Sequence, residues 1–371
     1  MPDNAATSEK AKRYSAIKYV SSIVDTAYMI LLLAIFAGSG ASKVVAASIS
    51  DFFARDFLTL PAYLLVVYIG YSIVNFPLNF YRSFVVERVF HLSNQKAADW
   101  LKDQLKSGMI FYLISFILFA VFYYTVAKSP RGWWVIVSLA WIFFSIIMAK
   151  LFPLIIIPLF FKYKPVSDDV LRQRIIGLAA KMRVSILNVF EIDFSKKTVK
   201  ANAAFVGWGK GRRVILADTL KNKYTVEEIE VILAHEFAHY RLKHLIKLIL
   251  INSFVTLVTF YLIFKTSGYV LGLFGFSSLG DIAAFPLILL YFVIFGLIMQ
   301  PIANYSSRIF ERNADLMALR VTGLKEAFIS MMEKLASQNL ADPKPSRLVK
   351  VFFFDHPPIE ERIALAKSFN K

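Results

Sequence analysis

Residues 226–264 read VEEIEVILAHEFAHYRLKHLIKLILINSFVTLVTFYLIF, and they join a charged amphipathic segment to a long apolar run. Thr225 followed by Glu228 is typical of a capping box at the start of a helix, and apolar residues at helical spacing follow. Leu245–Phe264 then has the length of about 20 residues that a helix needs to cross a bilayer. This stretch therefore predicts a polar helix that leads directly into a membrane span.

The composition of the whole chain agrees with a membrane protein. Of its 371 residues 57% are hydrophobic and only 19% are charged, and 35 are Phe. In soluble domains about a quarter of the residues are charged. Many of the apolar side chains of this chain are therefore expected to face lipid. The six predicted spans are Tyr19–Phe36, Leu58–Phe80, Met109–Ala127, Trp133–Phe161, Leu245–Phe264 and Ile282–Ala303.

Two polar regions interrupt the spans. The first holds three strand-like runs, Ile186–Ile192, Asn202–Trp208 and Arg212–Asp218, and Gly207, Gly209 and Gly211 at the junction of the last two suit a tight connection. The second, 306–371, is expected to be helical. The sequence therefore predicts a mostly α-helical polytopic membrane protein with an α+β domain that contains a short β-sheet.

The net charge of +17 comes largely from Lys and Arg residues in the segments outside the spans. Lys and Arg concentrate in the N-terminal tail, the 81–106 loop, the 162–243 region and the C-terminal tail, which six spans place on one side of the membrane. By the positive-inside rule that side is the cytoplasm. The first apolar segment is interpreted as a retained helix and not as a removed signal peptide. Since no RNA- or DNA-reading motif is present, nucleic acid is not expected as a partner.

The stretch His235-Glu236-Phe237-Ala238-His239 has the HExxH pattern. On a helix, residues i and i+4 lie on one face, so two imidazoles can bind one Zn²⁺ while Glu236 takes a proton from the attacking water. The chain has no Cys, so any metal must be bound by His and carboxylates. The alternative is an ordinary amphipathic helix with two surface His, although three of the chain's 5 His (His235, His239 and His244) fall within ten residues.

A catalytic zinc usually has three protein ligands. Directly after the sixth span, Glu311 and Asp315 are four residues apart, so a helix would aim both carboxylates the same way. Glu311 could then bind zinc while Asp315 accepts a hydrogen bond from a ligating imidazole. In the alternative interpretation, these acids pair with Arg308 and Arg312 on a juxtamembrane helix.

HEFAH followed by one apolar hairpin and SRIFERNAD resembles the M48 metallopeptidases, whose pattern is HExxH…ExxxD. Three other stretches are similar to the same family: Asn202–Gly207 to its NAxxxG strand, His356–Arg362 to its HPP…R motif, and Phe76–Gln95 to a loop of the Ste24 branch, the CAAX prenyl proteases. The resemblance covers the chain from about Pro77 to Ala366 and implies a zincin-like catalytic domain.

The resemblance implies roles for single residues. One Zn²⁺ per chain would be bound by His235, His239 and Glu311. Asn202, Ala203 and Gly207 would align a peptide as an added strand, and His356 and Arg362 would stabilise the oxyanion. The expected division is 1–161 with four spans, 162–243 and 307–371 as the two parts of the catalytic domain, and 244–306 as a membrane hairpin. The chain departs from the Ste24 branch in having six spans instead of seven.

The expected function is that of a membrane zinc metalloendopeptidase acting on peptides or proteins, lipidated or otherwise associated with the bilayer. Both termini and the catalytic domain are expected in the cytoplasm, in a bacterial inner membrane or, in a eukaryote, the endoplasmic reticulum. The alternatives are a quality-control protease like the HtpX branch and a catalytically inactive scaffold. A transporter is disfavoured, since the spans are nearly free of charge.

Overall fold

The computed structural model describes residues 2–53, 56–207 and 211–370. Within these residues six helices are long and apolar enough to cross a membrane, and each corresponds to one predicted span. The fourth ends at Phe160, one residue before the predicted end. The membrane part of the chain consists of α1 (Pro2–Gly38), α2 (Ala41–Phe52), α3 (Asp56–Phe80), η1 (Tyr81–Val85), α4 (Val86–Val89), α5 (Ala97–Lys128), α6 (Trp133–Leu151), η2 (Phe152–Ile156), α7 (Ile157–Phe160), α11 (His244–Leu273), η5 (Ile282–Ala284) and α12 (Phe285–Thr322).

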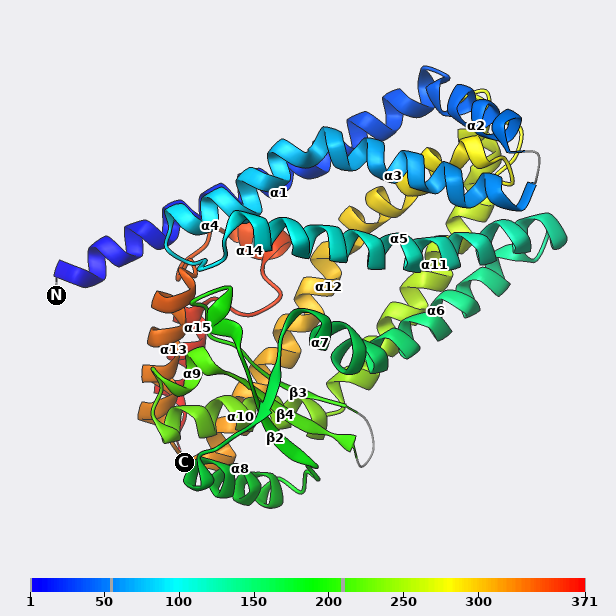
Figure 1. Ribbon diagram of the computed structural model, residues 1–371. Coiled ribbons are helices and arrows are strands. Elements are labelled where there is room, and N and C mark those ends of the chain that lie inside the picture. The colour runs from blue at the N-terminus through cyan, green and yellow to red at the C-terminus, as the bar shows by residue number, and fades with distance from the viewer. Residues whose placement is uncertain (1, 54–55, 208–210, 371) are drawn as a thin grey trace.

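The polar regions fold together at one end of this helical array (Figure 1). Their elements are β1 (Tyr163–Pro165), α8 (Asp169–Lys181), β2 (Asn188–Ile192), η3 (Phe194–Lys196), β3 (Ala203–Val206), β4 (Arg213–Ala217), α9 (Asp218–Lys221), α10 (Val226–Arg241), α13 (Lys325–Asn339), α14 (Arg347–Phe353) and α15 (Ile359–Ser368). The predicted fold class, a polytopic helical membrane protein with a small α+β domain, is confirmed.

The four strands form one mixed sheet in the order β1-β2-β4-β3. β2 and β4 are parallel, and the other two pairs are antiparallel. Each predicted strand-like run contains a strand, slightly shorter than the run itself. Of the residues expected at the β3–β4 connection, Trp208 and Gly209 lie outside the described residues. β3 is an edge strand of the sheet, which leaves its outer side available for pairing.

Gly207 ends β3 with a φ of 100°, a region that disfavours residues with a side chain. A Cβ at this position would lie 2.6 Å from the carbonyl oxygen of Gly211 and 3.1 Å from Cα of Arg212. Backbone atoms block the space, so the strand cannot turn towards β4 here with any other residue. The backbone conformation therefore requires glycine at position 207.

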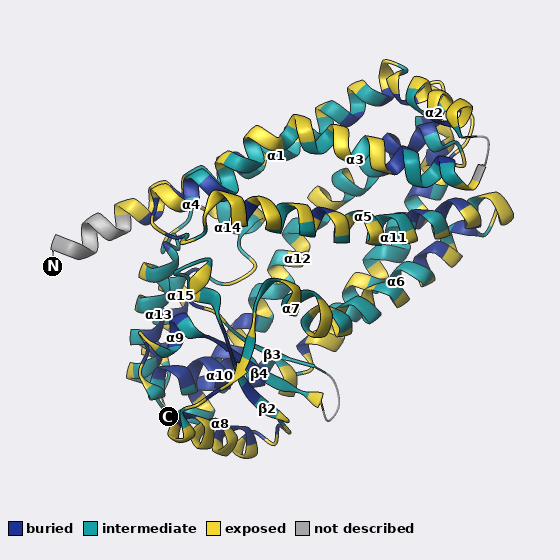
Figure 2. Ribbon diagram, viewed as in Figure 1, coloured by how far each residue is buried: buried dark blue, intermediate teal, exposed yellow. Residues whose placement is uncertain are grey.

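The described residues form two large apolar cores, and α12 contributes to both. Ala314, Ala318 and Leu319 pack with α8, α10 and the sheet in the polar domain. Phe285 and Ile288, at the other end of α12, pack in the helical array. Burial is dense in the polar domain, whereas exposed residues cover much of the long helices (Figure 2). That exposure of large apolar side chains is expected where the solvent is lipid.

Two π-helical turns interrupt the long helices. η1 continues α3 beyond Pro77, and η2 contains Pro153. Within η1, Arg82 Nη1 lies 2.7 Å from Asp25 Oδ2 on α1. This ion pair explains how Asp25 is tolerated within a helix long enough to span the membrane, because a paired charge costs less in an apolar environment.

Helix α10 begins with the predicted capping box. Thr225 Oγ1 accepts from the N–H of Glu228, and the Thr225 N–H donates to Glu228 Oε2 at 2.8 Å. The same carboxylate accepts from Lys334 Nζ and Ser330 Oγ, both at 2.7 Å, which links α10 to α13. Burial alone would raise the pKa of Glu228, but the hydrogen bonds from Lys334, Ser330 and the helix cap outweigh it and lower this pKa below the ordinary value.

We predict that Glu228→Gln lowers stability by about 2 kcal/mol at pH 7, because hydrogen bonds to a buried charge are lost. A carboxyl with a depressed folded-state pKa stabilises the protein above its unfolded pKa, and this stabilisation is lost as the pH falls through the folded value. The difference in unfolding midpoint between the two proteins in detergent should therefore shrink below about pH 4.5. Glu227→Gln, which changes a half-buried carboxylate of the same helical turn, is the control. A difference that does not change with pH would contradict the prediction.

Candidate metal centre and active site

Helix α10 carries the two histidines one turn apart on its inner face. His235 is buried, His239 is half-buried, and their Nε2 atoms lie 3.1 Å from each other. The neighbouring residues Leu233, Ala234, Phe237 and Ala238 are fully buried in the domain core, so packing on both sides fixes the rotation of the helix. The two imidazoles therefore direct their Nε2 atoms to the same point in space.

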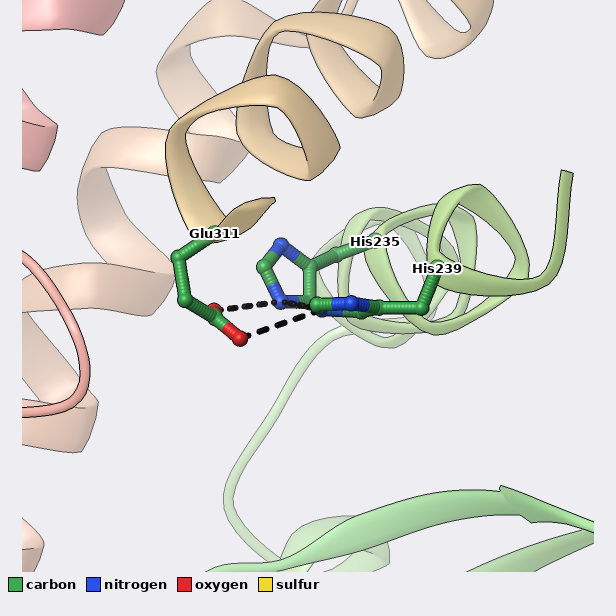
Figure 3. A group of neighbouring side chains, drawn as sticks. All are labelled: His235, His239 and Glu311. Carbon is green, nitrogen blue, oxygen red and sulfur yellow. Dashed lines mark hydrogen bonds and ion pairs between the residues drawn. The ribbon is translucent and has the colours of Figure 1, made fainter. Parts of the chain in front are cut away.

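Helix α12 supplies the third group from the opposite side (Figure 3). Glu311 is 6% exposed, and its Oε2 and Oε1 atoms lie 3.1 Å and 3.2 Å from the Nε2 atoms of His235 and His239. One ligand atom from each of the three residues lies within 4.8 Å of the other two. The three residues named from the sequence as a ligand set are thus brought together by two packed helices.

The chemistry of this group fits a metal ion. Two imidazole nitrogens and a carboxylate converge, which is one of the donor sets that zinc takes in catalytic sites. Glu311 Oε2 is buried and accepts no hydrogen bond from the described residues, although His235 Nε2 lies close to it. A buried carboxylate oxygen without a donor is costly, and a cation between the three side chains would satisfy it.

Asp315 supports His235 from behind. It has no exposed surface, and its Oδ1 accepts from His235 Nδ1 at 2.8 Å. With the proton on Nδ1, the lone pair of Nε2 is left free for the centre of the cluster. Arg308 instead donates to the carbonyl oxygens of Lys350 and Phe354. The geometry thus favours the metal-site interpretation of the two acids over pairing with arginines of the same helix.

Arg362 lies beside the cluster, with its Nη2 3.5 Å from Nδ1 of His235. It is buried, and it donates from Nε and Nη2 to the two carboxylate oxygens of Asp315 at 2.8 Å and 2.6 Å. A guanidinium held in this bidentate pair is aimed at Asp315 and not at the open side of the cluster. Its placement favours a positioning role through Asp315 over direct contact with an oxyanion.

Glu236 and His356 are at the more open side of the cluster. Glu236 is half-buried, and burial raises its pKa, an effect that the neighbouring His235 and His239 reduce. His356 is 49% exposed, and its Nε2 lies 3.3 Å from Glu311 Oε2. Its Nδ1 is 2.8 Å from Asp355 Oδ1, a partner that the sequence analysis missed although it directly precedes His356. A carboxyl and an imidazole thus flank the three central residues.

The NAxxxG segment lies beside the site. Phe205 of β3 packs against Phe237 of α10 with ring centroids 5.1 Å apart. Asn202 is exposed, and its carbonyl oxygen accepts from the Ala217 N–H, which starts the pairing of β3 with β4. Ala203 follows as the first residue of the edge strand. Asn202, Ala203 and Ala204 also line a pocket of about 500 Å³, whose other walls are mostly apolar side chains of α5, η2, α7, η3, β2 and β4.

The loop similar to that of the Ste24 branch supports the start of β3. Glu87 Oε2 lies 2.9 Å from Lys200 Nζ, and its Oε1 accepts from Tyr14 Oη at 2.7 Å. Ser93 and Thr198 form an isolated antiparallel bridge. This loop therefore connects α1 and the membrane helices to the chain just ahead of Asn202.

We predict that Arg362 and Asp315 are energetically coupled. Removing one partner by Arg362→Met or Asp315→Leu leaves a buried unpaired charge and should cost about 3–5 kcal/mol, whereas the double variant should lose less than the sum. Chemical unfolding of the full chain in detergent measures the three values. Additive losses would show that the pair is not coupled.

Family models match both halves of the chain. The model described as peptidase family M48 matches residues 165–369. The model described as CAAX prenyl protease N-terminal, five membrane helices, matches residues 4–162. In that part, the described residues hold four helices long enough to span a membrane, together with the short α2.

Similar proteins cover most of the chain. An uncharacterized metalloprotease of Bacillus subtilis, YhfN, is 30% identical over 96% of this chain and 84% of its own length. The CAAX prenyl protease 1 of Saccharomyces cerevisiae is 27% identical over 79% of this chain and 68% of its own. The crystal structure of S. mikatae Ste24p has the same fold, with a TM-score of 0.84 and 24% identity over 97% of this chain and 88% of that chain.

Proposed function

The chain belongs to peptidase family M48 and is a multi-pass membrane metalloprotease, and from this premise we propose that it is a zinc endopeptidase with Glu236 as its general base. We propose His235, His239 and Glu311 as the ligands of one zinc ion. The observation that carries the proposal is the convergence of two Nε2 atoms on the buried Glu311 carboxylate, whose Oε2 has no hydrogen-bond donor among the described residues. When bound, zinc would supply Lewis-acid activation of the attacking water and of the peptide carbonyl.

Glu236 is proposed to move the proton of the reaction. Its carboxylate adjoins His235 on α10, and burial raises its pKa, which makes it a stronger base than an exposed Glu. It would accept a proton from the attacking water and donate it to the leaving amine. Water and amide bond are consumed, and a carboxylic acid and an amine are formed.

His356 is proposed to stabilise the negative charge that develops on the carbonyl oxygen. Asp355 accepts from its Nδ1 at 2.8 Å, and Nε2 lies on the side of Glu311 and the cluster. Burial lowers the pKa of His356, but the carboxylates of Asp355 and Glu311 outweigh this effect and raise the pKa, which favours the imidazolium and so an Nε2–H as well. An N–H fixed in advance towards the developing charge lowers the barrier without reorganisation. Arg362 is proposed to act through Asp315, by holding the His235 imidazole in its tautomer.

The substrate is proposed to bind as an extended strand along β3. Asn202 and Ala203 begin this edge strand, and Gly207 ends it with a turn that only glycine permits. An added strand gains its affinity from main-chain hydrogen bonds and its selectivity from neighbouring pockets. The apolar pocket against Asn202–Ala204 favours a membrane-associated peptide with an apolar group near the cleavage site, in agreement with relatives named CAAX prenyl proteases.

The proposed arrangement places 162–243 and 307–371 together as one catalytic domain beneath the spans of 1–161 and 244–306. The packing of α10 against α12 supports this division, because the ligands come from both parts. We propose that the domain and both termini lie in the cytoplasm, and the basic residues of the loops on that side support this orientation.

We predict about one zinc per chain in the wild type and loss of most of it in Glu311→Ala, because two imidazoles alone bind zinc weakly. Metal analysis of the full chain purified in detergent without chelators measures this. Glu326→Ala, an exposed change on α13, is the matched control. A wild type without zinc, or a Glu311→Ala variant that retains it fully, would contradict the ligand set.

We also predict that Glu236→Gln keeps its zinc and loses about 10²–10⁴-fold in hydrolysis, because the amide cannot accept the proton. Cleavage of a prenylated CAAX peptide and of casein should be measured for the wild type, Glu236→Gln and the exposed control Glu326→Gln. Preference for the CAAX peptide supports the proposed substrate class, and preference for casein supports a quality-control protease. Full activity of Glu236→Gln would exclude it as the base.

A further inference from the structure

We propose that His244 is a positioning residue of the metal centre, whose Nδ1 accepts a hydrogen bond from Nδ1 of His239 and so directs His239 Nε2 towards the metal. The inference rests on the zinc site proposed above and assigns it a second supporting group. The two Nδ1 atoms lie 3.0 Å apart. His244 is 1% exposed and is not one of the three converging groups.

The orientation of His239 requires such an acceptor. Its Nε2 lies 3.1 Å from His235 Nε2 and 3.2 Å from Glu311 Oε1, so this nitrogen faces the centre of the cluster. When Nε2 offers its lone pair to a metal, the proton of the neutral imidazole resides on Nδ1. A buried N–H needs an acceptor, and metal-bound histidines usually have one behind them. His244 Nδ1 is at the required distance.

A break in the chain brings the two imidazoles together. Residues five apart in a continuous helix point about 140° away from each other. Between α10 and α11, however, Lys243 adopts the left-handed conformation with φ 57° and ψ 35°, although it is not a glycine. This turn directs His244, the first residue of α11, back to His239. The left-handed backbone is strained for a residue with a Cβ and therefore needs a compensating interaction.

His244 is also held from the side of the third ligand. Its ring stacks on Phe310 of α12 at 4.7 Å between centroids and 18° between planes. Phe310 directly precedes Glu311, so α12 contacts both the cluster and the residue behind His239. The ring of His244 is thus fixed by two of the elements that build the site.

The hydrogen bonding of His244 indicates more than packing. Its Nε2 is buried and has no hydrogen-bond partner among the described residues. A buried N–H without an acceptor is destabilising, and an apolar residue at this position would avoid that cost. The ring orientation thus leaves Nε2 unsatisfied and keeps Nδ1 against His239.

The two imidazoles then have different supports. His235 donates to a carboxylate, Asp315, whereas His239 donates to a neutral imidazole. Glu311 and Asp315 are already two buried acids, and Arg362 is the cation bonded to Asp315. A neutral acceptor behind His239 adds no third buried negative charge.

Three substitutions test the inference. In His244→Asn the amide oxygen replaces Nδ1, in His244→Gln it reaches the position of Nε2, and His244→Leu has no acceptor. Zinc affinity of the full chain in detergent is measured by competition with a chelator, starting from metal-free protein. We expect Asn to stay within about threefold of the wild type and Gln and Leu to bind about 10–100-fold more weakly.

Phe310→Leu separates packing from hydrogen bonding, because it removes the stacked ring and keeps the acceptor. We expect it to bind zinc within about threefold of the wild type. An equal loss in Phe310→Leu and His244→Leu, or equal affinities of the Asn and Gln variants, would overturn the inference. The Asn–Gln comparison decides even when His244→Leu does not fold. A wild type that binds no zinc overturns the proposed ligand set as well, whereas a zinc-binding wild type with unaffected variants overturns only the role of His244.

Discussion

The buried carboxylate of Asp315 is held by Arg362 from the last helix and in turn holds His235 on α10. Because a buried charge is stable only when it is paired, the position of Asp315 requires α15 to be docked against α12. The tautomer of His235 then follows from Asp315, and the open face of the cluster follows from that tautomer. The geometry of the candidate metal centre therefore depends on a contact between the C-terminal helix and a helix that begins on the far side of the membrane.

The parts of the molecule that the sequence predicted are those with a local signal. A short segment is enough to predict each of three features: the length of a span, the i, i+4 spacing of His235 and His239, and the capping box at Thr225. The partner of Arg362 depends on a contact with Asp315, 47 positions away, and no local pattern carries it. The same is true of the parallel pairing of β2 with β4. The role of His244 was missed because Lys243 bends the chain without being a glycine.

The two apolar cores form in different solvents. The core around α10 excludes water in the usual way, whereas the core around Phe285 and Ile288 lies in a helical array whose outer residues remain exposed. In the second core lipid replaces water, so packing and hydrogen bonds such as that from Ser42 Oγ to the Ala283 carbonyl must supply the specificity. Since α12 belongs to both cores, it fixes the position of the polar domain relative to the helical array.

Because the cluster is divided between α10 and α12, its residues are synthesised at different times. His235 and His239 are synthesised before α11, and Glu311 follows only after α12 has been made. Two membrane crossings thus separate the groups that must meet. A ribosome-bound or incompletely inserted chain contains the HExxH helix without its carboxylate partner. With the proposed ligand set, such a chain has no complete metal site, so cleavage activity would arise only after α12 has been made.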